Sequence, residues 1–159
     1  MQAKLYAGLT YEQVVQKYVG SVYGVCVMRL QNYADAEDCS QNVFVKLYSK
    51  SPEFTNENYL KAWLLRVAVN ECNKHIRKNK RLVSLENVKS EKISFPEDSY
   101  DISWALMKTP QKYRDVLYLH YCEKYKIKEI AVILDIKENS VKTLLKKGRE
   151  ILKSIYGGD

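Results

Sequence analysis

The sequence has little proline or glycine and no long apolar run. Three prolines and six glycines are spread over 159 residues, and β-branched residues recur at helical spacing, not in alternation, so strands are not expected. No stretch approaches the roughly 18 uninterrupted apolar residues that a membrane span requires, and the first residues lack the pattern of a secretory signal. The composition therefore predicts an all-α protein that is soluble, intracellular and not inserted in a membrane.

Residues suited to catalysis or metal binding are also scarce. The four cysteines have no CxxC pair and no histidine at metal-ligand spacing; they are Cys26, Cys39, Cys72 and Cys122. We interpret them as reduced packing residues. His75 and His120 are single, not paired by spacing with a nucleophile, and are expected at surface or partly buried helix positions. Because there is also no glycine-rich phosphate loop, we expect no metal, no cofactor and no enzyme activity.

What the sequence has in excess is positive charge. The 26 lysines and arginines outnumber the 19 acids, for a formal net charge of +7. This balance favours a polyanionic partner, although ribosomal proteins, membrane-surface proteins and proteins with merely solvated lysines share it. The positions of the charges must decide between these classes.

Three helices are predicted in a first domain, residues 1–81. The first covers 10–30, where Thr10 and Gln13 can form a capping box, and its core stripe is expected to contain Val15, Tyr18, Val22, Cys26 and Leu30. The second begins near Ala34 with acids in its first turn, which suit the positive end of the helix dipole. A polar loop over 51–58 separates it from a third helix over 59–81.

The apolar pattern breaks over residues 82–100 and then returns. Residues 86–101 hold five acids and two lysines, in contrast with their basic neighbours, and we interpret 82–100 as a flexible acidic linker. A second small domain is predicted over 101–159, with helices at 102–107 and 111–121 and two shorter helices extending to 156.

The third helix has a cationic polar face. On a helical wheel, one stripe contains Arg66, Asn70, Asn73, Lys74, Arg77 and Arg81. Trp63 projects into the same stripe, and an aromatic ring beside cations is the combination that holds unstacked bases and phosphates. The alternative is a solvated face with Trp63 buried against a neighbouring element.

The C-terminal residues show the spacing of a helix-turn-helix motif. Two apolar seams flank the turn Asp135-Ile136-Lys137: Ile127, Ile130, Ala131 and Leu134, then Val141, Leu145, Gly148, Leu152 and Ile155. Glu138 can cap the second helix or complement its dipole. Candidates for base and phosphate contact point away from the seam; they are Ser140, Lys142, Thr143, Lys146, Lys147 and Arg149. A helical hairpin with a basic surface would have the same pattern.

Three runs in this order resemble the sigma-70 family of RNA polymerase sigma factors, in its extracytoplasmic-function (ECF) group. They are YADAEDCSQNVFVKLY, NYLKAWLLRVAVNECNKHIRKNKR and TPQKYRDVLYLHYCEKYKIKEIAVILDIKENSVKTLLKKGRE. The resemblance implies a region-2 helical bundle, a region-4 helix-turn-helix domain, and promoter-specific transcription initiation in the cytoplasm. The implied partners are bacterial core RNA polymerase, promoter DNA and an anti-sigma factor.

The resemblance also implies sets of contact residues. Those facing the polymerase clamp would be Asp35, Glu37, Asp38, Gln41 and Asn42, although their acids also suit the helix dipole. A loop that captures a flipped minus-ten base would comprise Thr55, Asn56, Glu57 and Asn58, a composition that an ordinary surface loop shares. The displaced strand would follow Trp63, Arg66, Asn70, Lys74, Arg77, Lys78 and Arg81. At the minus-thirty-five element, the residues nearest the bases would be Ser140, Lys142, Thr143 and Lys146, with Lys147 and Arg149 nearer the backbone.

Four positions depart from the family pattern. Asn139 and Ser140 stand where a Gly-Thr pair is common, Asp135 replaces a turn glycine, and Leu144 stands where many members carry an arginine that contacts DNA. Asp135 is tolerable if its backbone is left-handed. Two rival hypotheses remain: a stand-alone helix-turn-helix regulator that binds duplex DNA as a dimer, and a decoy that occupies polymerase or an anti-sigma protein without initiating.

Overall fold

The computed structural model describes residues 3–83 and 102–157, and the chain divides into two compact units, Met1–Glu91 and Lys92–Asp159. Within the described residues, every regular element is helical, and the β pairing amounts to one isolated bridge between Tyr6 and Leu9. The all-α class with two helical units is therefore confirmed. The predicted linker lies outside the described residues, apart from 82–83, which end the third helix. The predicted limits of the two domains stay a prediction.

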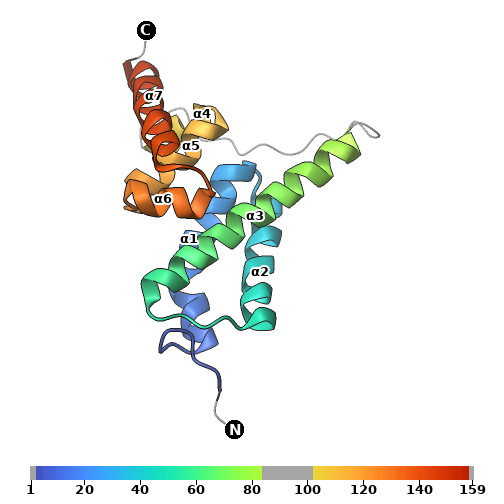
Figure 1. Cartoon of the computed structure of the whole chain (residues 1–159). Coiled ribbons are helices and arrows are strands. Elements are labelled where there is room, and N and C mark those ends of the chain that lie inside the picture. The colour runs from blue at the N-terminus through green and yellow to red at the C-terminus, as the bar shows by residue number, and fades with distance from the viewer. Residues whose placement is uncertain (1–2, 84–101, 158–159) are drawn as a thin grey trace. The chain divides into compact units, whose positions relative to one another are not determined.

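Three helices form the first unit: α1 (Tyr11–Leu30), α2 (Tyr33–Lys50) and α3 (Glu57–Val83), each packed against the other two (Figure 1). The capping box at the start of α1 is confirmed, since Thr10 accepts a hydrogen bond from the Gln13 backbone and the Gln13 side chain accepts one from the Thr10 backbone. Asn32 caps α2 by accepting from the backbone N–H of Asp35 at 3.0 Å. These caps satisfy backbone donors that the helices cannot satisfy themselves.

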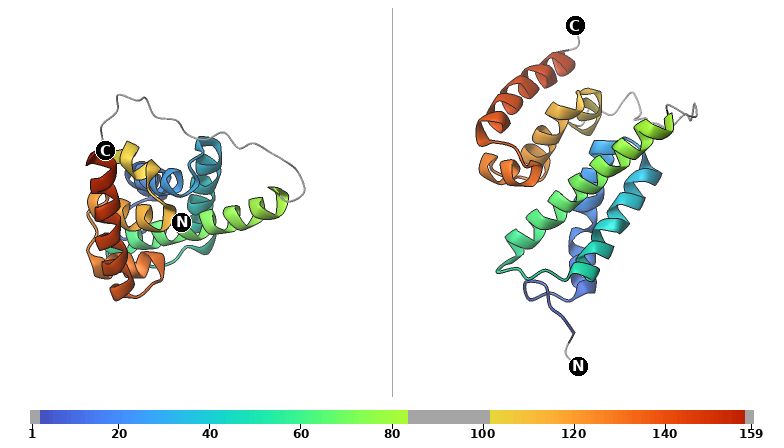
Figure 2. Two further views of the ribbon diagram at one scale, coloured as in Figure 1. Left: turned by 90° about the horizontal axis from the view of Figure 1, so that it is seen from above. Right: turned by 45° about the vertical axis from the view of Figure 1, so that its right-hand side comes forward.

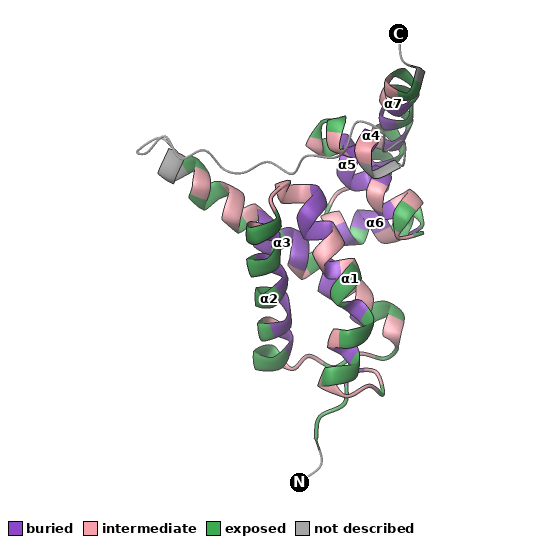
Figure 3. Cartoon of the chain, turned by 180° about the vertical axis from the view of Figure 1, so that it is seen from behind, coloured by how far each residue is buried: buried purple, intermediate pink, exposed green. Residues whose placement is uncertain are grey.

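The core of this unit lies where the three helices face one another, and exposed residues follow the outer side of α2 (Figure 3). The expected core stripe of α1 was wrong at its ends: Val15 and Leu30 are only half-buried, whereas Val14 and Val25 are buried. Because α1 packs against two helices, its buried arc extends beyond the expected stripe, which accounts for the burial of Val14 and Val25.

Three of the four cysteines come from different helices and are buried in this core as free thiols: Cys26, Cys39 and Cys72. The interpretation as packing residues holds for them. The neighbouring Cys72 sulfur and burial raise the pKa of the Cys39 thiol, and contact with Cys26 and burial raise that of Cys72. Thiols held protonated in this way are unreactive. Cys122, by contrast, is exposed, so the packing interpretation was wrong there.

The second unit contains α4 (Ile102–Lys108), α5 (Gln111–Leu117), a π-helical turn η1 (Tyr118–Cys122), α6 (Ile127–Leu134) and α7 (Glu138–Gly157). The helix predicted over 111–121 is therefore α-helical only to Leu117. Buried Arg114 donates to the carbonyls of Leu106 and Thr109, which satisfies backbone acceptors at the end of α4.

Helix α7 packs along α5 within this unit (Figure 2). The close approach depends on Gly148, because a Cβ there would lie 3.0 Å from a methyl carbon of the buried Leu117. In the described ranges, no helix combines the length and the apolar composition needed to cross a bilayer.

Candidate nucleic-acid and protein interfaces

The basic stripe of α3 faces solvent over most of its length. Three of its cations are exposed, namely Arg66, Lys74 and Arg77, as are Asn70 of the stripe and the neighbouring Lys78. The side chain of Arg81 lies outside the described residues. The spacing of these residues places them along one side of a helix about 40 Å long. They form a linear cationic surface of the kind that follows a nucleic-acid backbone.

Some residues of this stripe contact other residues of the bundle. Asn73 is half-buried and accepts a hydrogen bond from Arg29 of α1, so it does not belong to the exposed face that the helical wheel predicted. Lys74 lies 3.7 Å from the nearly buried carboxylate of Glu71, which also forms an ion pair with Lys46 of α2. Glu71 raises the pKa of Lys46, and the nearby Lys46 ammonium lowers that of Lys74.

The aromatic part of the stripe is larger than the sequence predicted. Trp63 is half-buried and meets Phe54 edge to face, with ring centroids 5.9 Å apart. Phe54 covers part of the Trp63 ring and solvent reaches the rest, so a role for the ring in binding bases stays a prediction. Tyr59, one turn earlier on the same face, is 63% exposed. Sequence reasoning missed Tyr59, although its spacing of four residues from Trp63 was the available signal.

The polar loop before α3 is shorter than predicted, because α3 begins at Glu57. Asn56 caps the helix by accepting from the Tyr59 backbone N–H at 3.1 Å. The Glu57 carboxylate binds the Lys17 ammonium and the Tyr18 hydroxyl, each at 2.5 Å. Both contacts lower the pKa of Glu57, Lys17 most strongly. Glu57 therefore anchors the loop to α1, whereas Thr55, Asn56 and Asn58 are exposed.

Of the five residues of α2 predicted to face the polymerase clamp, one is half-buried and four are exposed. Asp35 is half-buried, and its carboxylate lies 3.1 Å from Nε2 of His75 on α3. The exposed residues are Glu37, Asp38, Gln41 and Asn42. The same side of α2 continues into Val45 and Tyr48, which are 62% and 68% exposed. Sequence reasoning missed this pair, whose signal was apolar residues at solvent positions of the helix.

The helix-turn-helix geometry is confirmed. Asp135 caps the end of α6 in the left-handed conformation (φ 55°), the conformation expected of an aspartate in place of the turn glycine. Val141, Leu145 and Leu152 are buried in the unit's own core. The predicted DNA-facing residues of α7 are all exposed: Ser140, Lys142, Thr143, Lys146, Lys147 and Arg149.

Comparison with known proteins identifies the family. The family model described as Sigma-70 region 2 matches residues 14–82, and that described as Sigma-70, region 4 matches residues 105–152. The chain is 30% identical to the ECF RNA polymerase sigma factor SigW of Bacillus subtilis, over 90% of this chain and 87% of the relative. It belongs to the ECF group of the sigma-70 family. The B. subtilis ECF sigma factor SigM is 26% identical, over 93% of this chain and 96% of that protein.

Solved structures support the fold of this sigma factor. The sigma factor RpoE, crystallised with the anti-sigma factor NepR from Bartonella quintana, superimposes with a TM-score of 0.79 at 22% identity, covering 94% of this chain and 98% of that one. CnrH, in complex with the cytosolic domain of CnrY, gives a TM-score of 0.65 at 17% identity, covering 94% and 88%. The sigma factor therefore shares its helical architecture with both.

Two departures from the family pattern can now be placed in this sigma factor. Asn139 is exposed near the start of α7, where its backbone carbonyl accepts from the Thr143 hydroxyl at 3.0 Å. Leu144 is half-buried beside the core residue Leu145. Because the side chain of leucine is apolar, Leu144 offers DNA neither charge nor hydrogen bonds.

Proposed function

We propose that this sigma factor divides promoter opening between its two units. The first unit binds core RNA polymerase through α2 and the displaced minus-ten strand through α3 and the loop before it. The second unit binds the minus-thirty-five duplex through α7. The observation that carries the proposal is that, within one bundle, α2 exposes acids and amides beside Val45 and Tyr48, whereas α3 exposes a row of cations. Surfaces of such different charge suit two different macromolecules.

The exposed cations of α3 bind phosphates of the single strand. Tyr59 and the solvent-facing part of Trp63 provide stacking surfaces for bases that have left the duplex. Capture of unstacked bases then drives strand opening without hydrolysis of a nucleotide, and the sigma factor contributes no catalytic step of its own. Asn56 and Asn58 offer hydrogen bonds near the start of the stripe. The Asn56 side-chain oxygen is already used for capping, so its amide N–H groups are the ones to reach a base.

The polymerase-binding surface combines charge with apolar area. Glu37, Asp38, Gln41 and Asn42 supply the polar contacts, and the exposed Val45 and Tyr48 extend the surface toward the end of α2. Large apolar side chains at the centre of an interface carry most of its binding energy, while charges steer association. Because Asp35 is engaged with His75, we assign it to holding α2 against α3 more than to direct polymerase contact.

The second unit binds the major groove with the exposed side of α7. Ser140, Lys142, Thr143 and Lys146 face the bases, while Lys147 and Arg149 contact phosphates. Arg149 is oriented by donating to the Tyr121 hydroxyl at 3.4 Å. Since Leu144 adds no polar contact, binding of the isolated unit is weak. Tethering of both units to polymerase raises their effective concentration at correctly spaced elements.

We further propose that an anti-sigma protein controls this sigma factor, which acts in the cytoplasm with RNA polymerase. The support is its likeness in fold to RpoE and CnrH, whose structures contain NepR and the cytosolic domain of CnrY.

The test is transcription with purified bacterial core polymerase on a library of promoter-containing duplexes at moderate salt. We expect specific initiation, and the selected sequences should reveal two conserved elements at fixed spacing. Duplex binding without polymerase binding would instead indicate a stand-alone regulator. Polymerase binding without initiation would indicate a decoy.

A further inference from the structure

The π-helical turn η1, which follows α5, gives Tyr121 a direction that an α-helix would not. The backbone N–H of Glu123 donates to the carbonyl of Tyr118, five residues earlier, at 3.1 Å. Continued as an α-helix, the chain would place Tyr121 above Leu117, which is four residues earlier and is fully buried beside Gly148 of α7. The wider π turn moves Tyr121 off that buried line. Its side chain is accordingly half-buried and in contact with solvent.

Contacts within the same segment fix the ring of Tyr121. It meets the ring of His120 edge to face, with centroids 4.8 Å apart and planes at 82°. Nδ1 of His120 lies 3.0 Å from the carbonyl oxygen of Tyr125, and because a carbonyl only accepts, Nδ1 carries the hydrogen. The backbone N–H of Tyr125 in turn donates to the carbonyl of the buried Leu119 at 2.9 Å. The backbone therefore holds His120, whose ring supports that of Tyr121.

The hydroxyl of Tyr121 reaches Arg149 on α7. Nη1 of Arg149 donates to the hydroxyl oxygen at 3.4 Å, which is long for a hydrogen bond. A hydroxyl can accept and also donate its one hydrogen, whereas a guanidinium has five N–H donors and no acceptor. The hydroxyl that accepts from Arg149 therefore keeps its hydrogen for a different acceptor. Two donor groups lie side by side here, spaced to reach different oxygens of one anion.

The charges around this pair favour a phosphate of duplex DNA. Lys146 and Lys153 lie three residues before and four residues after Arg149, on the same side of α7, and all three are exposed. Arginine and tyrosine side chains both donate to phosphate oxygens, and such contacts place a protein on the duplex without reading its sequence. Hydrogen bonds to a charged phosphate are stronger than those between neutral groups.

We propose that Tyr121 and Arg149 together bind one phosphate of the minus-thirty-five duplex. Arg149 supplies the charge. Tyr121 holds the guanidinium in place and donates its own hydroxyl hydrogen to a second oxygen of the same phosphate. The inference rests on the proposed function of α7 and adds a residue from outside the helix-turn-helix. Tyr121 thereby helps to set the register in which α7 lies in the major groove.

The experiment measures binding of holoenzyme, made from the full chain and core polymerase, to a fluorescent promoter recovered by the transcription test. Phosphates around the minus-thirty-five element are replaced one at a time by uncharged methylphosphonates. For the wild type, we expect one phosphate whose replacement weakens binding roughly tenfold, the scale of charge-assisted hydrogen bonds, and whose penalty disappears in Arg149→Gln.

Tyr121→Phe should lower the penalty at that same phosphate and leave the penalties at the others unchanged. It should also weaken binding of the unmodified duplex several-fold, up to about tenfold, and by the same factor for different promoter sequences. The loss in Tyr121→Phe/Arg149→Gln should be smaller than the product of the two single losses, because the two residues act on one phosphate.

Tyr118→Phe is the matched control, because it removes from the same turn a hydroxyl whose partner is Glu123, at 3.0 Å. It should keep the wild-type penalty at every phosphate. Tyr121→Phe retains its ring, so its unfolding temperature and its affinity for core polymerase should match those of the wild type.

Two results would separate this inference from the proposed function. If Tyr121→Phe keeps the full penalty, or lowers it equally at all phosphates, the inference is overturned and the proposed function of α7 stands. If Arg149→Gln and Lys147→Gln both leave every penalty unchanged, α7 does not bind the duplex backbone, and both are overturned.

Discussion

Replacing Arg66 and Arg77 together with glutamine should reduce the salt dependence of strand binding by a calculable amount. The two residues are eleven positions apart on the exposed side of α3, or about 16 Å along the helix axis, and each is assigned one phosphate. A contact with a single-stranded phosphate contributes roughly 0.7 to the slope of log K against log salt concentration. Loss of both should lower the slope by about 1.4. Between about 50 and 200 mM salt, the affinity of the variant should therefore fall about sevenfold less than that of the wild type.

Lys74 provides an internal comparison. Its ammonium lies 3.7 Å from the Glu71 carboxylate, so part of its charge is already balanced within the protein. Lys74→Gln should then lower the slope by clearly less than the roughly 0.7 expected of an unbalanced phosphate contact. A slope equal to that of Arg77→Gln would show that Glu71 is fully neutralised by Lys46.

The assay is fluorescence anisotropy of holoenzyme on forked promoter DNA at a series of salt concentrations, with core polymerase affinity measured separately. An unchanged slope in the double variant would refute the assignment of α3 to the strand backbone. So would a loss of polymerase affinity as large as the loss of strand affinity, because the two surfaces would then not be distinct.

Three further predictions concern the docking surface, the packing of both units and the anchored loop. Changing Glu37 and Asp38 to lysine should weaken core polymerase binding at least tenfold while heat-denaturation curves stay unchanged, as a titration with labelled polymerase would measure. Gly148→Ala should destabilise its unit by about 1–2 kcal/mol, because overpacking exceeds the gain in helix propensity. Gly20→Ala, whose added Cβ meets nothing within 4 Å, should instead stabilise α1 by about 0.5–1 kcal/mol. Urea denaturation measures both changes in the free energy of unfolding, and changes of the same sign would contradict the packing argument. The ion pair with Lys17 lowers the pKa of Glu57, so this contact stabilises the fold at pH values above the usual carboxyl pKa and is lost as pH falls through the lowered pKa. Between about pH 7 and pH 3, the free energy of unfolding of Glu57→Gln should therefore decrease less than that of the wild type.

The sequence predicted the features that depend on neighbours along the chain. Thr10 and Gln13 signalled the start of α1 because a capping box needs only residues three apart. The turn at Asp135 and the seam of α7 followed from helical spacing in the same way. The exposed cations of α3 and α7 could also be predicted, since the direction of a side chain on a helix follows from its position.

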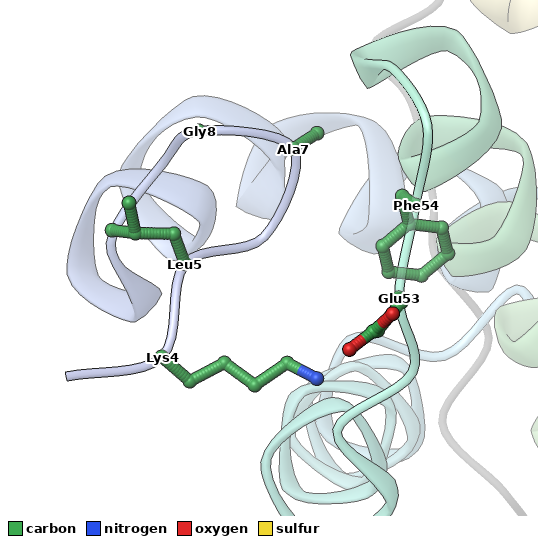
Figure 4. Close-up of a pocket in the computed structure, with 6 residues that line it drawn as sticks. All are labelled: Lys4, Leu5, Ala7, Gly8, Glu53 and Phe54. Atoms are coloured by element: carbon green, nitrogen blue, oxygen red, sulfur yellow. The ribbon is translucent and has the colours of Figure 1, made fainter. Parts of the chain in front are cut away.

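Which of those side chains are free to act was decided only by the tertiary structure. Asn73 follows the basic stripe in sequence but binds Arg29, which is 44 residues away. Glu57 belongs to the loop by composition but is anchored to α1 by Lys17. Helical spacing predicts the direction in which a side chain points but not the residue that it contacts. That residue lies on another helix, whose rotation and position along its axis depend on how the whole core packs. The segment before α1 has the same origin: Lys4 and Glu53 lie far apart in the chain but line one open hollow (Figure 4), because Tyr6 is buried and its hydroxyl lies 3.4 Å from that of Ser51, which follows α2.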